Sequence, residues 1–126
     1  MIDSIDHLVL NVSSIKKAKK FYGDILKLKI IEFKKDRFAI DLGDQKINLH
    51  QKQTIATPKA KLPSNGSLDI CFISKTPLKE IKKHLQKNQI EIIEFGVKRV
   101  GAKGPLYSLY IYDFDGNLIE LCNEII

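Results

Sequence analysis

In the first part of the chain, the pattern of hydrophobic positions changes from alternation to a spacing of three and four residues. The run Ile5–Val12 alternates as a strand does, and Ser14 then offers a side chain that can open a helix. An apolar stripe follows at helical spacing, made by Ile15, Ala18, Tyr22 and Ile25. Three short strand-like stretches complete this half, and they are Lys29–Phe33, Arg37–Leu42 and Lys46–His50.

The second part of the chain presents the same signals in the same order. A strand-like run, Leu68–Ile73, precedes Thr76, a candidate helix opener with Pro77 at the first helical position. The helical stripe is Leu78, Ile81 and Leu85, and the strands predicted after it are Ile92–Phe95, Leu106–Tyr112 and Asn117–Cys122. Each half therefore predicts the order β-α-β-β-β, which belongs to the α+β class.

An internal repeat supports this division. The sequence Ile30–Phe33 recurs as Ile92–Phe95, a shift of 62 residues that also carries His7 onto Asp69. Aligning the last strands, Lys46–His50 with Gly116–Glu120, requires a shift of 70, so about eight residues are inserted in the second half. They fall in the Gly/Lys/Arg-rich stretch Gly96–Gly104. We predict one domain over residues 1–126, with modules at 1–50 and 66–126 joined by a linker at 51–65.

Strand alternation places four metal-ligating side chains on corresponding faces of the two modules. The repeat sets His7 against Asp69, and the alignment of the last strands sets His50 against Glu120. If the modules pack about a pseudo-twofold axis, with a mixed sheet curling around a cavity, these four side chains converge there. Imidazole and carboxylate ligands suit Zn, Ni, Mn, Co or Fe. The sequence thus predicts a divalent-metal site made by His7, His50, Asp69 and Glu120.

Each of these residues also has a simpler interpretation. A strand histidine is more often packed or exposed than metal-bound, Asp69 can cap a turn after Gly66-Ser67, and Glu120 can be a surface residue. The shared site is favoured because all four occupy repeat-matched positions on otherwise apolar strands, where an unpaired buried carboxylate is costly.

Substrate contacts are predicted from two further features. Tyr110 lies on a predicted strand and either lines a pocket or simply packs there. The stretch Gly96–Gly104 carries Lys98, Arg99 and Lys103 and is either a mobile lid that binds an anionic substrate or a surface loop.

The amino-acid composition indicates which binding partners and which cellular compartment to expect. The net charge is +6, but Arg37 and Arg99 are the only arginines, and a near-absence of arginine argues against phosphate and base recognition. A solvated lysine coat explains the charge better. Two cysteines, no signal-like segment at the N-terminus and no long apolar run predict a cytoplasmic protein that neither spans a membrane nor binds nucleic acid.

Three segments resemble the vicinal oxygen chelate superfamily, which includes glyoxalase I, extradiol dioxygenases, fosfomycin-resistance proteins and bleomycin-binding proteins. They are Asp6–Leu10, Phe21-Tyr22 and Asp113–Glu120, the last being the most recognisable motif. The resemblance covers the whole chain and is greatest to small glyoxalase-domain proteins. It implies His7, His50 and Glu120 as metal ligands and a homodimer. At position 69 glyoxalase I and the fosfomycin thiol transferases usually have histidine, so Asp69 departs from both and is left as a fourth ligand or a partner of a ligand.

The resemblance implies a metal-dependent enzyme of lyase or isomerase type, acting on a small substrate that chelates the metal through neighbouring oxygens. Glu120 or Asp69 would then move a proton. Two alternatives remain open: a non-haem Fe(II) ring-cleaving dioxygenase, and a metal-free protein that sequesters a drug or metabolite, as the bleomycin binders do. A nucleic-acid module is a distant third.

Overall fold

The computed structural model describes residues 1–126, which divide into two units, Met1–Gly66 and Ser67–Ile126. In the first unit β1 (His7–Asn11) is followed by a helix that starts as α1 (Ile15–Ala18) and continues as the π-helical segment η1 (Lys19–Ile25). Three strands follow, which are β2 (Lys29–Lys34), β3 (Arg37–Asp41) and β4 (Lys46–His50). They form one mixed sheet in the order β1-β4-β3-β2, in which only β1 and β4 are parallel.

The second unit repeats this architecture. Its elements are β5 (Asp69–Ile73), α2 (Leu78–Lys87), β6 (Glu94–Val100), β7 (Pro105–Tyr112) and β8 (Leu118–Glu124). The sheet order is β5-β8-β7-β6, again with one parallel pair, β5 and β8. Both units therefore have the predicted β-α-β-β-β order, and the α+β fold class is confirmed.

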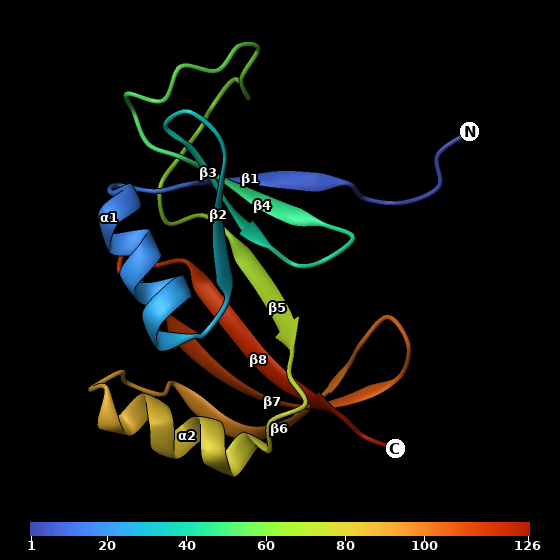
Figure 1. Ribbon diagram of the computed structural model, residues 1–126. Coiled ribbons are helices and arrows are strands. Elements are labelled where there is room, and N and C mark those ends of the chain that lie inside the picture. The colour runs from blue at the N-terminus through green and yellow to red at the C-terminus, as the bar shows by residue number, and fades with distance from the viewer. The chain divides into compact units, whose positions relative to one another are not determined.

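Each helix packs on one face of its own sheet (Figure 1). In the first unit Tyr22, Ile47 and Leu49 are buried, and the ring of Tyr22 meets that of Phe21 edge to face at 4.9 Å between centroids. In the second unit the buried side chains are Leu78 and Leu85 of the helix and Leu109, Ile111 and Ile119 of the sheet. Because side chains alternate between the two faces of a strand, the face of each sheet that points away from its helix can carry polar residues.

The two helices begin in different ways. Ser14 caps the first helix as predicted, because its Oγ accepts a hydrogen bond from the Lys17 amide at 3.2 Å. The prediction for Thr76 is wrong, since Pro77 occupies the cap position and offers no side-chain hydrogen bond. The Leu78 amide instead donates to Oδ1 of Asn123, on β8, at 2.8 Å. A side chain distant in the sequence thus accepts the helix-start hydrogen bond that a local cap residue usually accepts.

Gly96–Gly104 is largely strand and not a loop. Residues Gly96–Val100 continue β6, with Arg99 opposite Leu106, and only Gly101–Gly104 remain as the turn into β7. That turn is closed by a hydrogen bond from the Gly101 amide to the Gly104 carbonyl at 2.7 Å. The inserted residues therefore lengthen a hairpin, and the lid hypothesis applies at most to its tip.

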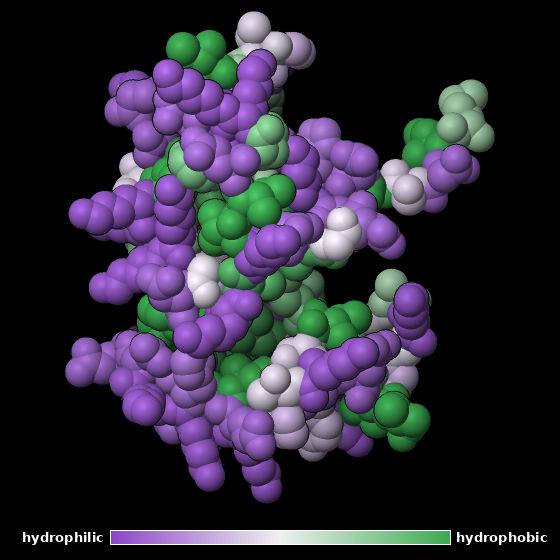
Figure 2. All heavy atoms as spheres, viewed as in Figure 1, coloured by the Kyte–Doolittle hydropathy of each residue, from purple (hydrophilic) through white to green (hydrophobic).

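Hydrophilic side chains dominate much of the visible surface, including that of both helices (Figure 2). No helix of the chain combines the length and the apolar character that crossing a bilayer requires.

Candidate functional site

Strand register decides which residues of the two units are equivalent. His7 pairs with Lys46 in the first sheet, and Asp69 pairs with Leu118 in the second. His7 and Asp69 are also the first residues of β1 and β5, which are equally long, so they correspond at the shift of 62 that the repeat predicted. The last strands, however, correspond at a shift of 72 residues and not 70.

Hydrogen bonds beyond the sheets support the larger shift. Val12 donates to the carbonyl of His50 at 2.8 Å, and Ser74 donates in the same way to Cys122. The counterpart of His50 is thus Cys122, so the predicted equivalence of His50 and Glu120 is wrong by two residues. The extended β6–β7 hairpin and a longer β7–β8 turn absorb the difference.

The counterpart of Glu120 is Asn48, a residue that our reasoning from the sequence missed. It lies on β4 between Val9 of β1 and Ala39 of β3 and is 7% exposed. Its amide oxygen Oδ1 is buried without a hydrogen-bond partner, which costs about 1–3 kcal/mol. A buried amide oxygen without a hydrogen-bond partner has its lone pairs available to a metal ion or another ligand. The signal in the sequence was its place two residues before His50, on the same face.

Asn48 and His50 lie at different distances from His7 along the first sheet. Because Lys46 is level with His7, Asn48 lies two residues further along the sheet, roughly 7 Å, and His50 four residues, roughly 13 Å. Asp69 and Glu120 have the shorter of these spacings in their own unit. His7 and Asn48 therefore form the same kind of pair as Asp69 and Glu120.

His7 is oriented by its neighbour in the sequence. Its Nδ1 lies 2.7 Å from Oδ2 of Asp6, which favours a proton on Nδ1 and leaves Nε2 able to bind a metal. Carboxylates commonly hold metal-binding imidazoles in this way.

His50 is 8% exposed, and its Nε2 lies 3.3 Å from Nη2 of Arg37. Burial, followed by the charges of Arg37 and Lys59, lowers the pKa of His50. The imidazole is therefore neutral at neutral pH and accepts the guanidinium hydrogen bond. This gives His50 a partner within the protein, which Asn48 Oδ1 lacks.

In the second unit Glu120 is held by a hydroxyl. Ser108 Oγ, fully buried on β7, donates to Glu120 Oε2 at 2.6 Å.

Tyr110 lies opposite Glu120 in the β7–β8 pairing. Its hydroxyl accepts a hydrogen bond from Arg99 Nε at 2.9 Å, and Arg99 also lies 3.4 Å from the carboxylate of Glu94. Burial is the largest cause that raises the pKa of Tyr110, so the phenol stays protonated.

Two hollows lie on this face of the second sheet, of ≈ 390 Å³ and ≈ 360 Å³. Arg99 and Glu120 line both of them, Lys103 lines the first, and Asp69 and Tyr110 line the second. All five residues predicted for this half are therefore on one face. Within either unit alone, no three histidine, cysteine or acidic side chains form a metal-binding group.

The two thiols are not activated. Cys71 Sγ lies 3.5 Å from Cys122 Sγ, and burial is the main cause that raises the pKa of both. A nucleophilic cysteine needs the opposite shift.

Comparison with known proteins agrees with this architecture. The model of the glyoxalase-like domain matches residues 5–126. The chain belongs to this family. It is 46% identical to virulence protein STM3117 of Salmonella typhimurium over 125 residues, 99% of this chain and 87% of the relative. The crystal structure of that protein has a TM-score of 0.93, with 45% identity and 99% of both chains covered.

More distant members of the family carry names that describe an activity. Metallothiol transferase FosB of Staphylococcus saprophyticus is 33% identical over 122 residues, which are 96% of this chain and 77% of the relative. The crystal structure of lactoylglutathione lyase from Agrobacterium tumefaciens has a TM-score of 0.72 at 21% identity, with 98% of this chain and 95% of that chain covered. This last likeness is one of fold.

Proposed function

We propose that the chain is a divalent-metal-dependent enzyme of the lyase or isomerase type. Its substrate is a small molecule that offers two neighbouring oxygens to the metal. The observation that carries the proposal is the strand register, which gives each unit a pair of donor side chains with the same spacing: His7 and Asn48, Asp69 and Glu120.

The chemistry of these donors fits a divalent transition metal. One imidazole, two carboxylates and an amide oxygen are nitrogen and oxygen ligands of the kind that Zn, Ni, Mn, Co and Fe accept. His7 has its Nε2 available, and the unpartnered Oδ1 of Asn48 gains a partner when it binds a cation. When bound, such an ion acts as a Lewis acid and stabilises negative charge on substrate oxygens.

The remaining side chains suggest how the substrate is held and how a proton is moved. Ser108 fixes Oε2 of Glu120, so Oε1 is the atom that accepts or returns a proton. Arg99 and Lys103 supply positive charge beside the hollows that Glu120 lines, which favours an anionic substrate. Tyr110, a protonated phenol tied to Arg99, can donate a hydrogen bond or be displaced by the substrate.

The first test is metal content, measured by mass spectrometry on untagged protein purified without added metal. We expect near-stoichiometric transition metal in the native protein and in His84→Ala, which removes the histidine on α2 outside the proposed site. Glu120→Gln and Asn48→Ala should lose most of it. His50→Ala should keep it, because His50 is too far along the sheet from His7 and has Arg37 as its partner.

Loss of metal from His50→Ala but not from Asn48→Ala would restore the ligand set predicted from the sequence. If the native protein binds none of these five metals even after reconstitution, the enzyme proposal fails. Stoichiometric, metal-independent capture of a small molecule would then favour a binding protein. Oxygen consumption with a catechol by the iron form would instead favour a dioxygenase. A homodimer is part of the proposal, and light scattering of the purified protein measures it directly.

A further inference from the structure

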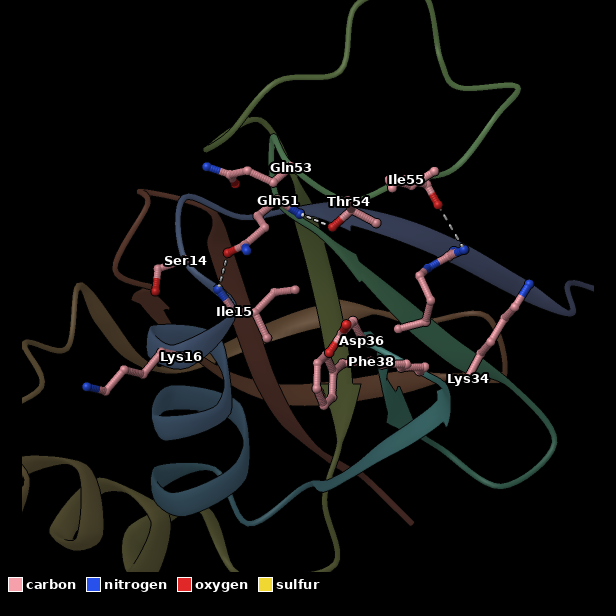
Figure 3. A pocket seen from close by; sticks show the side chains of 12 residues that line it. Ser14, Ile15, Lys16, Lys34, Asp36, Phe38, Gln51, Gln53, Thr54 and Ile55 are labelled. Atoms are coloured by element: carbon pink, nitrogen blue, oxygen red, sulfur yellow. Dashed lines mark hydrogen bonds between the residues drawn. The ribbon is translucent and has the colours of Figure 1, made fainter.

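A separate pocket lies in the first unit, where three segments meet: the start of α1, the β2–β3 turn and the residues after β4 (Figure 3). Its volume is ≈ 640 Å³, which is in the range of small-molecule sites. The residues that line it include Ile15 and Lys16, Lys34 to Phe38, and Thr54 and Ile55. None of the four proposed metal ligands is among its lining residues.

The side chains that line this pocket are of two kinds, cationic and apolar. Lys34, Lys35 and Arg37 bring three positive charges against the single carboxylate of Asp36, whereas the ammonium group of Lys16 points away from the other lining side chains (Figure 3). Ile15, Phe38 and Ile55 supply apolar and aromatic surface. An excess of cations beside apolar walls selects a ligand that has an anionic head and an apolar body. We propose that this pocket binds a small organic anion of that kind, a carboxylate or a phosphate ester.

Hydrogen bonds within and between these segments hold the walls in place. Gln51 Oε1 accepts from the Ile15 amide at 3.0 Å, which ties the helix start to the segment after β4. Thr54 Oγ1 accepts from the Gln51 amide at 3.0 Å, and Arg37 Nη1 donates to the Ile55 carbonyl at 3.4 Å. A pocket whose walls are already joined needs little ordering when a ligand enters, so less of the binding energy is lost.

Arg37 provides the most specific group for an anion. Its guanidinium contacts Ile55 and His50 through its two terminal nitrogens, while its Nε–H is buried without an acceptor. A buried donor without an acceptor is unfavourable. The guanidinium is held in place by Ile55 and His50, and its fixed positive charge beside the pocket attracts an anion.

The test is titration of the full-length, isotope-labelled protein with phenyl phosphate, followed by amide chemical shifts. Inorganic phosphate tests binding of the anionic head alone, and benzyl alcohol tests binding of the aromatic ring alone. We expect saturable shifts in Lys34–Phe38 and Thr54–Ile55, strongest for phenyl phosphate. The double variant Lys34→Glu, Lys35→Glu should weaken binding by about tenfold, because two attractive charges become repulsive.

The matched control is Lys79→Glu, Lys83→Glu on α2, which changes the net charge by the same amount on exposed positions of the second unit. This control should bind phenyl phosphate as the native protein does. Equal weakening in both double variants would mean non-specific attraction to the lysine coat and would overturn the proposal. Shifts confined to the second sheet, around Arg99, or no saturable shifts at all, would overturn it as well. Loss of metal from the native protein leaves this titration unchanged, so the two proposals fail separately.

Discussion

Replacing Asn117 with alanine should destabilise the second unit. Asn117 is fully buried just before β8, and its side chain connects two segments. Its Oδ1 accepts from the Leu68 amide, ahead of β5, at 2.9 Å, and its Nδ2 donates to Asp113 Oδ2 at 2.8 Å. The variant leaves the Leu68 amide without this acceptor and the carboxylate of Asp113 without this donor.

The magnitude follows from these two contacts. An orphaned buried amide costs about 1–3 kcal/mol, and a lost hydrogen bond to a charged group costs about 1.5–3 kcal/mol. Water that enters the vacated space recovers part of this, so we expect the free energy of unfolding to fall by about 2–5 kcal/mol. With a urea m-value of roughly 1.5 kcal/mol/M for a chain of this size, the midpoint moves down by roughly 1.5–3 M.

Urea unfolding followed by far-UV circular dichroism measures this shift. The matched control is Gln45→Ala, at the position that strand register makes equivalent to Asn117 in the first unit. Gln45 too hydrogen-bonds the backbone before the first strand, donating to the Ile5 carbonyl at 3.0 Å, but it is exposed, so its loss should cost less than about 0.5 kcal/mol. If both variants shift the midpoint equally, burial of this network does not have the stabilising role that we assign to it.

Three further outcomes are expected. Gly101→Ala should destabilise the β6–β7 hairpin by about 1–3 kcal/mol, because a Cβ there would lie 2.7 Å from Cδ1 of Leu106; an unchanged midpoint in thermal unfolding would contradict this. Leu109→Ala removes a fully buried core side chain and should cost about 2–5 kcal/mol in urea unfolding, whereas a cost under about 1 kcal/mol would mean that the core collapses around it. Asp6→Asn should weaken metal binding by about 10–100-fold, measured by competition with a chelator, and unchanged affinity would remove Asp6 as the group that orients His7.

The local patterns of the sequence were sufficient for the element order and for the faces of the strands. Alternation placed Asp69 and Glu120 on the same face, which the register of the second sheet bears out, and the repeat paired His7 with Asp69, the first residues of β1 and β5. These features depend on residues close together in the chain, where spacing alone determines which side chains point the same way.

The tertiary structure decided what depends on distant partners. Side chains alternate with a period of two, so a slip of two residues keeps every residue on its face, and the sequence therefore could not distinguish Asn48 from His50 as the counterpart of Glu120. The hydrogen bond from Leu78 to Asn123 joins residues far apart in the chain, and so does the contact between Arg37 and His50. No local pattern encodes such contacts, because only the pairing of whole strands brings their atoms within reach.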